Sequence, residues 1–373
     1  MVDAVSYRIM RTLSTTLLVL ASALAAFAQG PPARVTQPSS PEVHEDRRVT
    51  FRIQAPEAMK ITVVDGNLME ALDGPKDLTK GEDGVWSLTV GPLEPGIYDY
   101  GFSIDGSPRV PDPANRNLIR RTWGPTSYVE VPGAAPLFDS IRDVPHGTVS
   151  THTYHSKSLG VIRQFRVYTP PGYEAGSAKY PVLYLFHGGG GEETQWTTVG
   201  RADIILDNLI ADGKAVPMVV VMPYGHVPAR EGGNATEDFE KDLLQHVKPI
   251  IEKLYRVKTD RANRAIAGLS MGSGHSLHIG LGNLDLFSYV AAFSGGGRNQ
   301  GIENMSADEL NKKLKVLYLG CGKTDFVFES ANALDKLLTD KGINHLYTVT
   351  EGGHTWANWR HYLNEYAAML FKK

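Results

Sequence analysis

The chain has 373 residues, and at about 100–200 residues per domain this length allows two or three domains with a sizeable core. Hydrophobic residues make up 42% and charged residues 21%, which is an ordinary globular composition and excludes a peptide-sized or disulfide-stapled scaffold. With 38 Lys and Arg against 41 Asp and Glu the net charge is −3, so the strongly basic surface of a nucleic-acid-binding protein is not expected.

The first predicted element is an export signal. Arg11 precedes an apolar stretch at residues 17–28, which ends in an A-x-A motif. The stretch is too short to cross a hydrocarbon core of roughly 30 Å as a helix. A positive start, a short apolar segment and an A-x-A end are typical of a secretory signal peptide, although a buried N-terminal helix is the alternative. We predict that residues 1–28 are cleaved and that the protein is secreted, to the periplasm or the extracellular space, without a membrane span.

After a spacer at residues 29–42, which is rich in Pro and Ser, residues 43–131 contain short strand patterns without a helical period. Apolar and polar residues alternate in three runs, at residues 48–53, 85–90 and 97–104. Asp-Gly and Pro-Gly pairs, which favour turns, lie between these runs. About ninety residues of this kind predict a small β-sandwich.

The run "DGVWSLTVGPLEPGIYDYGFSIDG" and the later Asp112-Pro113 resemble the carbohydrate-binding module (family 48) that precedes the catalytic domains of glycogen-branching and debranching enzymes. The resemblance implies an immunoglobulin-like sandwich that contacts polysaccharide. Four aromatic residues alternate on the predicted strands and are expected to pack in the core or on a sheet face: Trp86, Tyr98, Tyr100 and Phe102. Trp123, beside Gly124 and Pro125, is the better candidate for stacking on a sugar.

A linker rich in Pro, Gly and Ala follows at residues 132–144, and residues 145–373 alternate strand and helix patterns. Short apolar runs suit strands that are buried on both faces, and they occur at residues 180–186, 218–222, 264–268, 289–293 and 316–320. Amphipathic stretches between them predict helices, notably at residues 237–255 and 329–341. This order predicts an α/β domain with a doubly wound, largely parallel sheet. The single cysteine, Cys321, is expected to be a small buried residue.

The run Gly268-Leu-Ser270-Met-Gly272 joins a predicted strand to a predicted helix and has the form G-x-S-x-G. A serine at such a turn adopts a strained backbone conformation that exposes its Oγ at the carboxyl end of the sheet. The next amide, Met271 N–H, lies at the helix start and points towards an oxyanion on the attacked carbonyl. This context predicts a nucleophile elbow with Ser270 as the nucleophile.

A serine nucleophile needs a base, and a neutral imidazole accepts its proton near pH 7. His354 lies in a Gly-flanked loop after the apolar segment 346–349 and before a terminal amphipathic helix. This position is at the sheet edge where Ser270 should emerge. Hydrolases of this architecture run Ser, then acid, then His along the chain, so we predict that His354 is the base.

The acid should therefore lie between Ser270 and His354, after another strand. Asp325 meets this condition, since it follows the predicted strand 316–320 by five residues, in a loop that contains glycine. Its carboxylate would accept the Nδ1–H of His354 and fix the tautomer. Glu329 and Asp335 are rivals, but both fall in the next predicted helix.

The second oxyanion donor is expected from the loop after an early strand, and residues 188–191, four consecutive glycines, suit this role. His187, just before them, is interpreted as structural. Phosphate binding by these glycines is the alternative, but the Lys-Ser/Thr of a P-loop does not follow them. There is no HExxH motif and no pair of cysteines, so no metal and no cofactor is predicted.

Four motifs in this half occur in a family order: "YLFHGGGGEETQW", "AIAGLSMG", "LYLGCGKTDF" and "GGHTWANWRHYL". They resemble the carbohydrate esterase family 1 type of α/β-hydrolase, most of all bacterial feruloyl esterases, with acetylxylan esterases, enterochelin esterases and S-formylglutathione hydrolase as relatives. The resemblance implies five functional residues: nucleophile Ser270, acid Asp325, base His354, and the oxyanion amides of Met271 and Gly189. Ser273 is a departure, because relatives commonly carry glycine there.

The resemblance also implies the substrate, which is feruloylated arabinoxylan or a related plant polysaccharide fragment. Ser270 would attack the ester that links a hydroxycinnamate to arabinose, and water would then release the acid from the acyl-enzyme. Three aromatic residues beside the motifs are predicted to wall an acyl pocket: Trp196, Phe326 and Trp356. The alternatives are an acetylxylan esterase, a siderophore (enterochelin-type) esterase, and a polysaccharide-binding protein with an inactive hydrolase domain.

Overall fold

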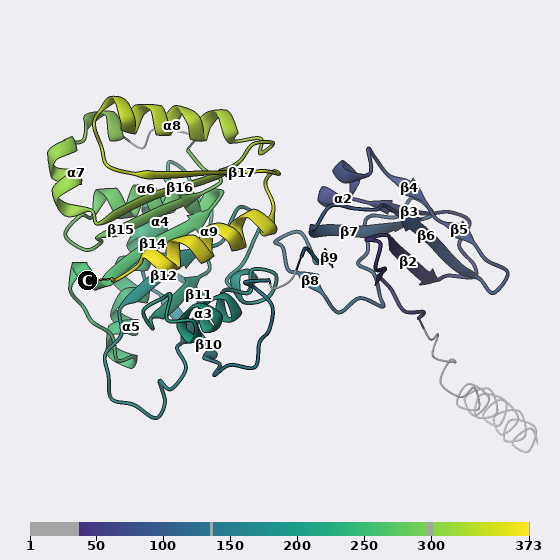
Figure 1. Ribbon diagram of the computed structural model, residues 1–373, viewed down its shortest axis with the longest axis horizontal. Helices are drawn as coiled ribbons and strands as arrows, with labels where there is room; N and C mark the ends of the chain where they lie inside the picture. The colour runs from purple at the N-terminus through teal and green to yellow at the C-terminus, as the bar shows by residue number, and fades with distance from the viewer. Residues whose placement is uncertain (1–36, 135–136, 297–300, 373) are drawn as a thin grey trace, which may run out of the picture.

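The computed structural model describes residues 37–134, 137–296 and 301–372 (Figure 1). The predicted signal peptide lies outside the described residues. Antiparallel sheets form the N-terminal region, and a larger α/β region surrounds one mixed sheet. No regular element occurs in the described residues between the last strand of the first region and the first strand of the second.

The N-terminal region has two antiparallel sheets, with strand orders β1-β2-β6-β5 and β4-β3-β7-β9-β8. The strands are β1 (Glu42–Val43), β2 (Val49–Gln54), β3 (Ile61–Val64), β4 (Lys76–Asp77), β5 (Thr79–Lys80), β6 (Val85–Val90), β7 (Gly96–Ile104), β8 (Leu118–Ile119) and β9 (Thr126–Val131). The three predicted strands correspond to β2, β6 and β7. A short helix, α2 (Gly66–Ala71), was not expected; with only six residues, it is too short for a helical period to stand out.

Both sheets contribute to one core. Phe51 of β2 and Tyr100 of β7 are fully buried, and their ring centroids lie 4.6 Å apart. Trp86 and Phe102 are buried in the same cluster, while Tyr98 is partly buried against it. The prediction that these aromatic side chains pack within the domain is confirmed, because alternate residues of a strand point to one face of the sheet.

The α/β region is built on an eight-stranded sheet with the order β10-β11-β13-β12-β14-β15-β16-β17. Its strands are β10 (Thr148–Ser156), β11 (Val161–Thr169), β12 (Val182–Phe186), β13 (Val219–Pro223), β14 (Arg264–Leu269), β15 (Tyr289–Phe293), β16 (Val316–Gly322) and β17 (Leu346–Thr350). Strands β10 and β11 form an antiparallel hairpin, β11 is antiparallel to β13, and the rest pair in parallel. The predicted α/β fold with a largely parallel sheet is confirmed.

Helices cover both faces of this sheet (Figure 1). The α-helices are α3 (Ala202–Ala211), α4 (Ala235–Asp242), α5 (Lys248–Leu254), α6 (Met271–Gly282), α7 (Ala307–Lys313), α8 (Phe328–Asp340) and α9 (Trp356–Met369). Short turns of other types are η1 (Gln195–Thr197), η2 (Leu243–Val247), η3 (Arg261–Asn263) and η4 (Ile302–Asn304). The stretch predicted as one helix over residues 237–255 is α4, the π-helical η2 and α5 in succession.

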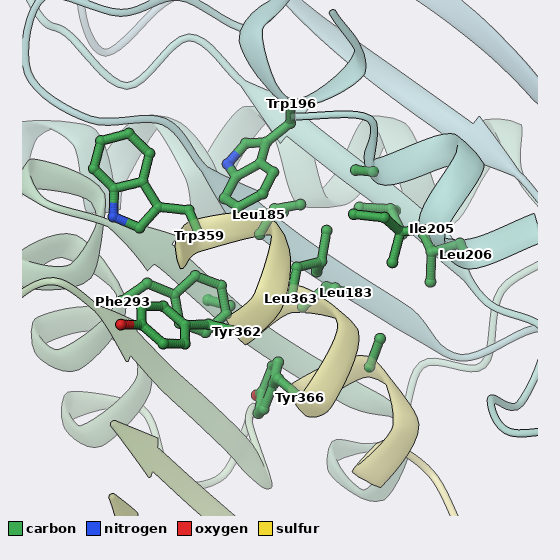
Figure 2. Close-up of a cluster of buried hydrophobic side chains, with 14 of the residues drawn as sticks. Leu183, Leu185, Trp196, Ile205, Leu206, Phe293, Trp359, Tyr362, Leu363 and Tyr366 are labelled. Carbon is green, nitrogen blue, oxygen red and sulfur yellow. The ribbon is translucent and has the colours of Figure 1, made fainter. Parts of the chain in front are cut away.

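Helix α9 covers one face of the sheet with a row of aromatic side chains. Figure 2 shows Trp359, Tyr362 and Tyr366 of this helix, and the rings of Tyr362 and Tyr366 contact Phe293 of β15. Helix α3 packs beside α9 on this face, so the core joins the C-terminal helix to the centre of the sheet. Cys321 is fully buried in β16, as predicted.

Helix α9 also connects the two regions through a buried charge cluster. The guanidinium of Arg360 is inaccessible to solvent and donates to Glu130 of β9 at 2.9 Å and to Asp139 at 2.8 Å. It also donates to the carbonyl of Val199. Arg201 forms a second ion pair with Glu130 at 2.8 Å. These contacts hold the last strand of the N-terminal region against the α/β region.

Candidate active site

Ser270 lies between β14 and α6 with φ 52° and ψ −116°, a strained conformation for a residue other than glycine. Glycine is required on both sides of this turn, because neither position has room for a side chain. A Cβ on Gly268 would lie 2.4 Å from the carbonyl oxygen of Gly272, and a Cβ on Gly272 would lie 2.5 Å from the carbonyl oxygen of His187. The G-x-S-x-G run therefore forms the tight strand-to-helix turn that the sequence predicts.

The glycine loop after β12 lies directly beside this turn. A Cβ on Gly188 would lie 3.2 Å from Cβ of Ser270, and one on Gly189 would lie 4.0 Å from Cβ of Met271. The first N–H groups of a helix have no partner within that helix, which leaves the amide of Met271 available to a ligand. The two amides predicted to bind an oxyanion thus belong to adjacent segments of backbone.

His187 holds the glycine loop in place through hydrogen bonds with two backbone groups. The backbone N–H of Gly225 donates to Nε2 of His187 at 2.8 Å, so Nδ1 carries the proton and donates to the carbonyl of Gly188 at 2.8 Å. Burial lowers the pKa of His187 to about 3, which keeps the ring neutral. Both ring nitrogens are occupied by backbone groups, and this agrees with a structural role.

His354 and Asp325 meet at the carboxyl end of the sheet. Nδ1 of His354 lies 3.0 Å from each carboxylate oxygen of Asp325, and the N–H of Val327 donates to the same carboxylate at 3.0 Å. Burial raises the pKa of Asp325, but hydrogen bonds from His354, Val327 and Ser294 outweigh burial and hold it below its usual range. Asp325 is therefore a carboxylate, and it holds the His354 proton on Nδ1.

The two rival acids lie elsewhere. Glu329 is exposed on α8, and Asp335 is hydrogen-bonded to His345 at 2.8 Å. Among the three predicted candidates, the described structure joins only Asp325 to His354.

The described residues form no hydrogen bond between the hydroxyl of Ser270 and the imidazole of His354. Catalytic hydrogen bonds are often long in ligand-free enzymes and tighten when substrate binds.

The three predicted pocket aromatics have different environments. Phe326 is 78% exposed, and its ring centroid lies 4.4 Å from that of His354. Trp196 is only 1% exposed; its Nε1–H donates to the carbonyl of Phe186, and its ring packs in the core (Figure 2). Trp356 is also buried, with edge contacts to Trp196 and Trp359. Against expectation, Trp196 is a core residue, because its ring packs in the cluster beneath α9. Trp356 belongs to the same cluster and also lines a cavity of about 30 Å³ beside His354.

A loop of the N-terminal region also reaches the site, a contact that the sequence leaves open. The N–H of Thr122 donates to the carbonyl of Gly190 at 2.9 Å, and the side-chain amide of Gln195 donates to the carbonyl of Arg120 at 2.8 Å. Trp123, 61% exposed, is part of this loop. An exposed tryptophan in a Gly-Pro loop was the only sequence signal.

A cleft of about 800 Å³ lies between the N-terminal region and the loop that carries His354. From the N-terminal region it is lined by residues that include Asn67, Tyr98, Asp99 and Arg121, and from the α/β region by residues that include Phe326, His354 and Trp359. Arg121 is held by an ion pair with Asp99 at 3.0 Å. The cleft thus has polar and aromatic side chains on both walls, with most of the charged ones on the wall of the N-terminal region.

Within residues 37–134, 137–296 and 301–372, no group of three or more His, Cys, Asp or Glu is arranged to hold a metal ion. Over the same ranges, every helix is too short or too polar to cross a membrane.

Residues 156–370 match the Esterase family. The chain is 35% identical over 357 residues to the endo-1,4-beta-xylanase/feruloyl esterase of Xylanibacter ruminicola, which covers 91% of this chain and 47% of that protein. It is 26% identical over 258 residues to endo-1,4-beta-xylanase Y of Acetivibrio thermocellus, with 60% of this chain and 23% of that protein covered. The chain therefore spans less than half the length of these two relatives.

Solved structures show the same likeness. The CE1 ferulic acid esterase of the anaerobic fungus Anaeromyces mucronatus aligns with a TM-score of 0.55 and 27% identity, over 64% of this chain and 96% of that one. The enterobactin esterase of Shigella flexneri aligns with a TM-score of 0.67 over 86% of this chain and 92% of that one, but at 17% identity this match shows the fold alone.

Proposed function

Because this chain belongs to the Esterase family and is a carboxylic ester hydrolase, we propose that it is a secreted serine esterase that hydrolyses feruloyl and related hydroxycinnamoyl esters of plant cell-wall polysaccharide. The observation that carries the proposal is the arrangement at the sheet edge: a strained Ser270 beside two available amides, and a His354 oriented by Asp325. The relative in Xylanibacter ruminicola, whose name includes feruloyl esterase, supports this substrate class.

In the proposed reaction, His354 Nε2 takes the proton of the Ser270 hydroxyl as Oγ bonds to the ester carbonyl carbon. The carbonyl oxygen becomes an oxyanion, which the N–H groups of Met271 and Gly189 stabilise. The ester C–O bond then breaks, and the His354 imidazolium donates its proton to the departing sugar hydroxyl. His354 then takes a proton from water as the water oxygen bonds to the acyl carbon. The bond between this carbon and Oγ breaks, His354 returns the proton to Oγ of Ser270, and the hydroxycinnamate leaves.

The cleft between the two regions supports the polysaccharide part of the proposal. It extends from His354 to the polar side chains of Asn67, Asp99 and Arg121, which suit the hydroxyl groups of a sugar chain. Phe326 lies at the same cleft beside His354 and offers an aromatic surface to the acyl group or a sugar ring. We propose that the N-terminal region is a carbohydrate-binding module with an immunoglobulin-like fold, and that it binds glycan as one wall of the active-site cleft.

The leading test is Ser270→Ala. We expect its kcat on methyl ferulate to fall by several powers of ten, as is usual when a triad nucleophile is lost. Ser276→Ala is the matched control: Ser276 is a buried serine of α6, the helix that follows Ser270, and its hydroxyl donates to the carbonyl of Gly272. This variant should keep its activity. A folded Ser270→Ala protein with wild-type turnover would remove Ser270 from the mechanism.

A substrate panel tests the ester class. Purified enzyme should release ferulate from methyl ferulate and from feruloylated arabinoxylan faster than it cleaves acetylated xylan or a catecholate trilactone. The trilactone is included because the enterobactin esterase shares the fold. Faster cleavage of the trilactone or of acetyl groups would replace the feruloyl assignment and leave the serine mechanism intact.

A further inference from the structure

Ser294 is a buried residue next to the site that the proposed mechanism does not use. It follows the last residue of β15, is inaccessible to solvent, and has a φ of 48°. Its N–H donates to the carbonyl of Gly320 in β16 at 2.7 Å. A left-handed conformation is costly for a residue with a Cβ and is often retained where function needs it.

The hydroxyl of Ser294 lies between Trp359 and Asp325. Nε1–H of Trp359 donates to Oγ of Ser294 at 2.9 Å, in a buried hydrogen bond. The indole nitrogen can only donate, so Oγ is the acceptor in that bond and its own proton is free for another. The Asp325 carboxylate lies beside this free proton: the Ser294 side chain is one of the groups that lower the pKa of Asp325, and a carboxylate can only accept a hydrogen bond.

Trp359 also touches the proposed base. Its ring packs edge to face against His354, with centroids 4.9 Å apart and an angle of 88° between the rings. The contacts therefore close a ring: Trp359 to Ser294, Ser294 to Asp325, Asp325 to His354, and His354 to Trp359. Trp359 belongs to α9 and Ser294 to the end of β15, so this ring ties the acid and the base to two rigid elements.

We propose that Ser294 and Trp359 are positioning residues, which hold the Asp325 carboxylate in the one orientation that directs His354 towards Ser270. The inference rests on the proposed function. The Ser294 hydroxyl and the Val327 N–H together prevent the carboxylate from rotating about its Cβ–Cγ bond. The Trp359 N–H in turn orients the Ser294 hydroxyl. Neither side chain transfers a proton in the reaction.

The test compares Ser294→Ala, Trp359→Phe and the double variant on methyl ferulate. Loss of one hydrogen bond to a charged group predicts a kcat about tenfold lower in Ser294→Ala, with KM nearly unchanged. Trp359→Phe keeps the ring against His354 and removes only the N–H, so a smaller loss is expected. Because the two act in series, the double variant should be no slower than Ser294→Ala.

Ser294→Gly separates the hydroxyl from the backbone strain. Glycine adopts a positive φ without cost, so this variant is expected to fold, and its kcat should fall as in Ser294→Ala. The proton NMR signal of His354 Nδ1–H gives a readout that needs no substrate, and it should move in both Ser294 variants. A purely structural role would lower the melting temperature and leave kcat and this signal unchanged.

Wild-type kcat in a folded Ser294→Ala or Ser294→Gly variant, or losses that multiply in the double variant, would overturn the inference. Labelling of the wild-type enzyme with a fluorophosphonate distinguishes this outcome from failure of the proposed function. If Ser270 of the wild type is not labelled, the serine mechanism fails, whatever the Ser294 variants show. If Ser270 is labelled at equal rates in the wild type and in Ser294→Ala, only the positioning role fails.

Discussion

The indole ring of Trp123 lies against the backbone of Gly190, so closely that a Cβ on Gly190 would come within 2.0 Å of ring carbon Cζ3. Gly190 has a φ of 68° and follows Gly189, whose amide is a proposed oxyanion donor. The N-terminal region is therefore in direct contact with the loop that completes the proposed active site, and its contribution should extend to substrates too small to reach the rest of the cleft.

Trp123→Ala tests this contact. Without the ring, the glycine loop loses its cover, and we expect kcat/KM on methyl ferulate to fall by about threefold to tenfold, since a small misplacement of a catalytic group lowers the rate. Met59→Ala is the control, because Met59 is an exposed apolar side chain of the same region, and it should leave the rate unchanged. Equal rates for Trp123→Ala and the wild type on both methyl ferulate and feruloylated arabinoxylan would contradict the prediction.

Gly190→Ala makes the same test from the other side of the contact. The added methyl group must displace the Trp123 ring, and the positive φ is strained for alanine. This variant should be slower on methyl ferulate than Trp123→Ala.

Arg360→Met should destabilise the protein strongly. It removes the buried cation and leaves Glu130 and Asp139 without it, and breaking one side of a buried charge cluster typically costs about 3–5 kcal/mol. The loss of stability is measured as the difference in the free energy of unfolding between the variant and the wild type, from urea titration. Adding Asp139→Asn to Arg360→Met should recover part of the loss, because the carboxylate left without a partner is then gone, whereas Glu130 keeps its ion pair with Arg201.

Lys336→Met is the matched control for this prediction. Lys336 pairs with Asp340 one helical turn away on the exposed face of α8, and exposed pairs of this kind contribute about 0.3–0.5 kcal/mol. Similar losses in Arg360→Met and Lys336→Met would show that the cluster does not hold the two regions together.

The sequence predicts what depends on local pattern. The apolar run 264–268 and the glycines on either side of Ser270 are patterns within a few residues. The strand and the turn after it can therefore be predicted without knowledge of the fold. The choice of Asp325 over Glu329 followed from its place after a strand, and chain order indicated His354. These inferences use the rule that parallel strands present their carboxyl ends at one edge.

The contacts that the sequence does not reveal join residues far apart in the chain. Arg360 and Glu130 are separated by 230 positions, and neither has a neighbouring residue that indicates the other. Trp196 lies beside the glycine motif in sequence, which suggested a pocket wall, yet its side chain turns into the core beneath α9. The direction of a side chain in a single short turn such as η1 depends on tertiary packing, which no local pattern encodes.

Stability should fall in mild acid because of buried histidines. His275, on α6 behind Ser270, is 4% exposed, and burial lowers its pKa from 6.5 to about 4. The unfolded chain binds a proton at this residue below about pH 6.5, whereas the folded protein does so only near pH 4, so the folded state loses stability as pH falls through this window. The contribution of one such group is about 1.4 kcal/mol per pH unit.

His275→Phe removes this contribution, and its ring should pack against Phe239, which already lies 4.8 Å from the His275 ring centroid. We expect its free energy of unfolding, measured by urea titration between about pH 7 and pH 4.5, to decline less steeply than that of the wild type. His187, whose pKa is lowered to about 3, remains and keeps part of the slope. His155→Phe, at an exposed histidine, controls for the loss of one imidazole. Parallel curves for His275→Phe and the wild type would mean that proton binding at His275 does not oppose folding, and the acid sensitivity would have to arise from other groups.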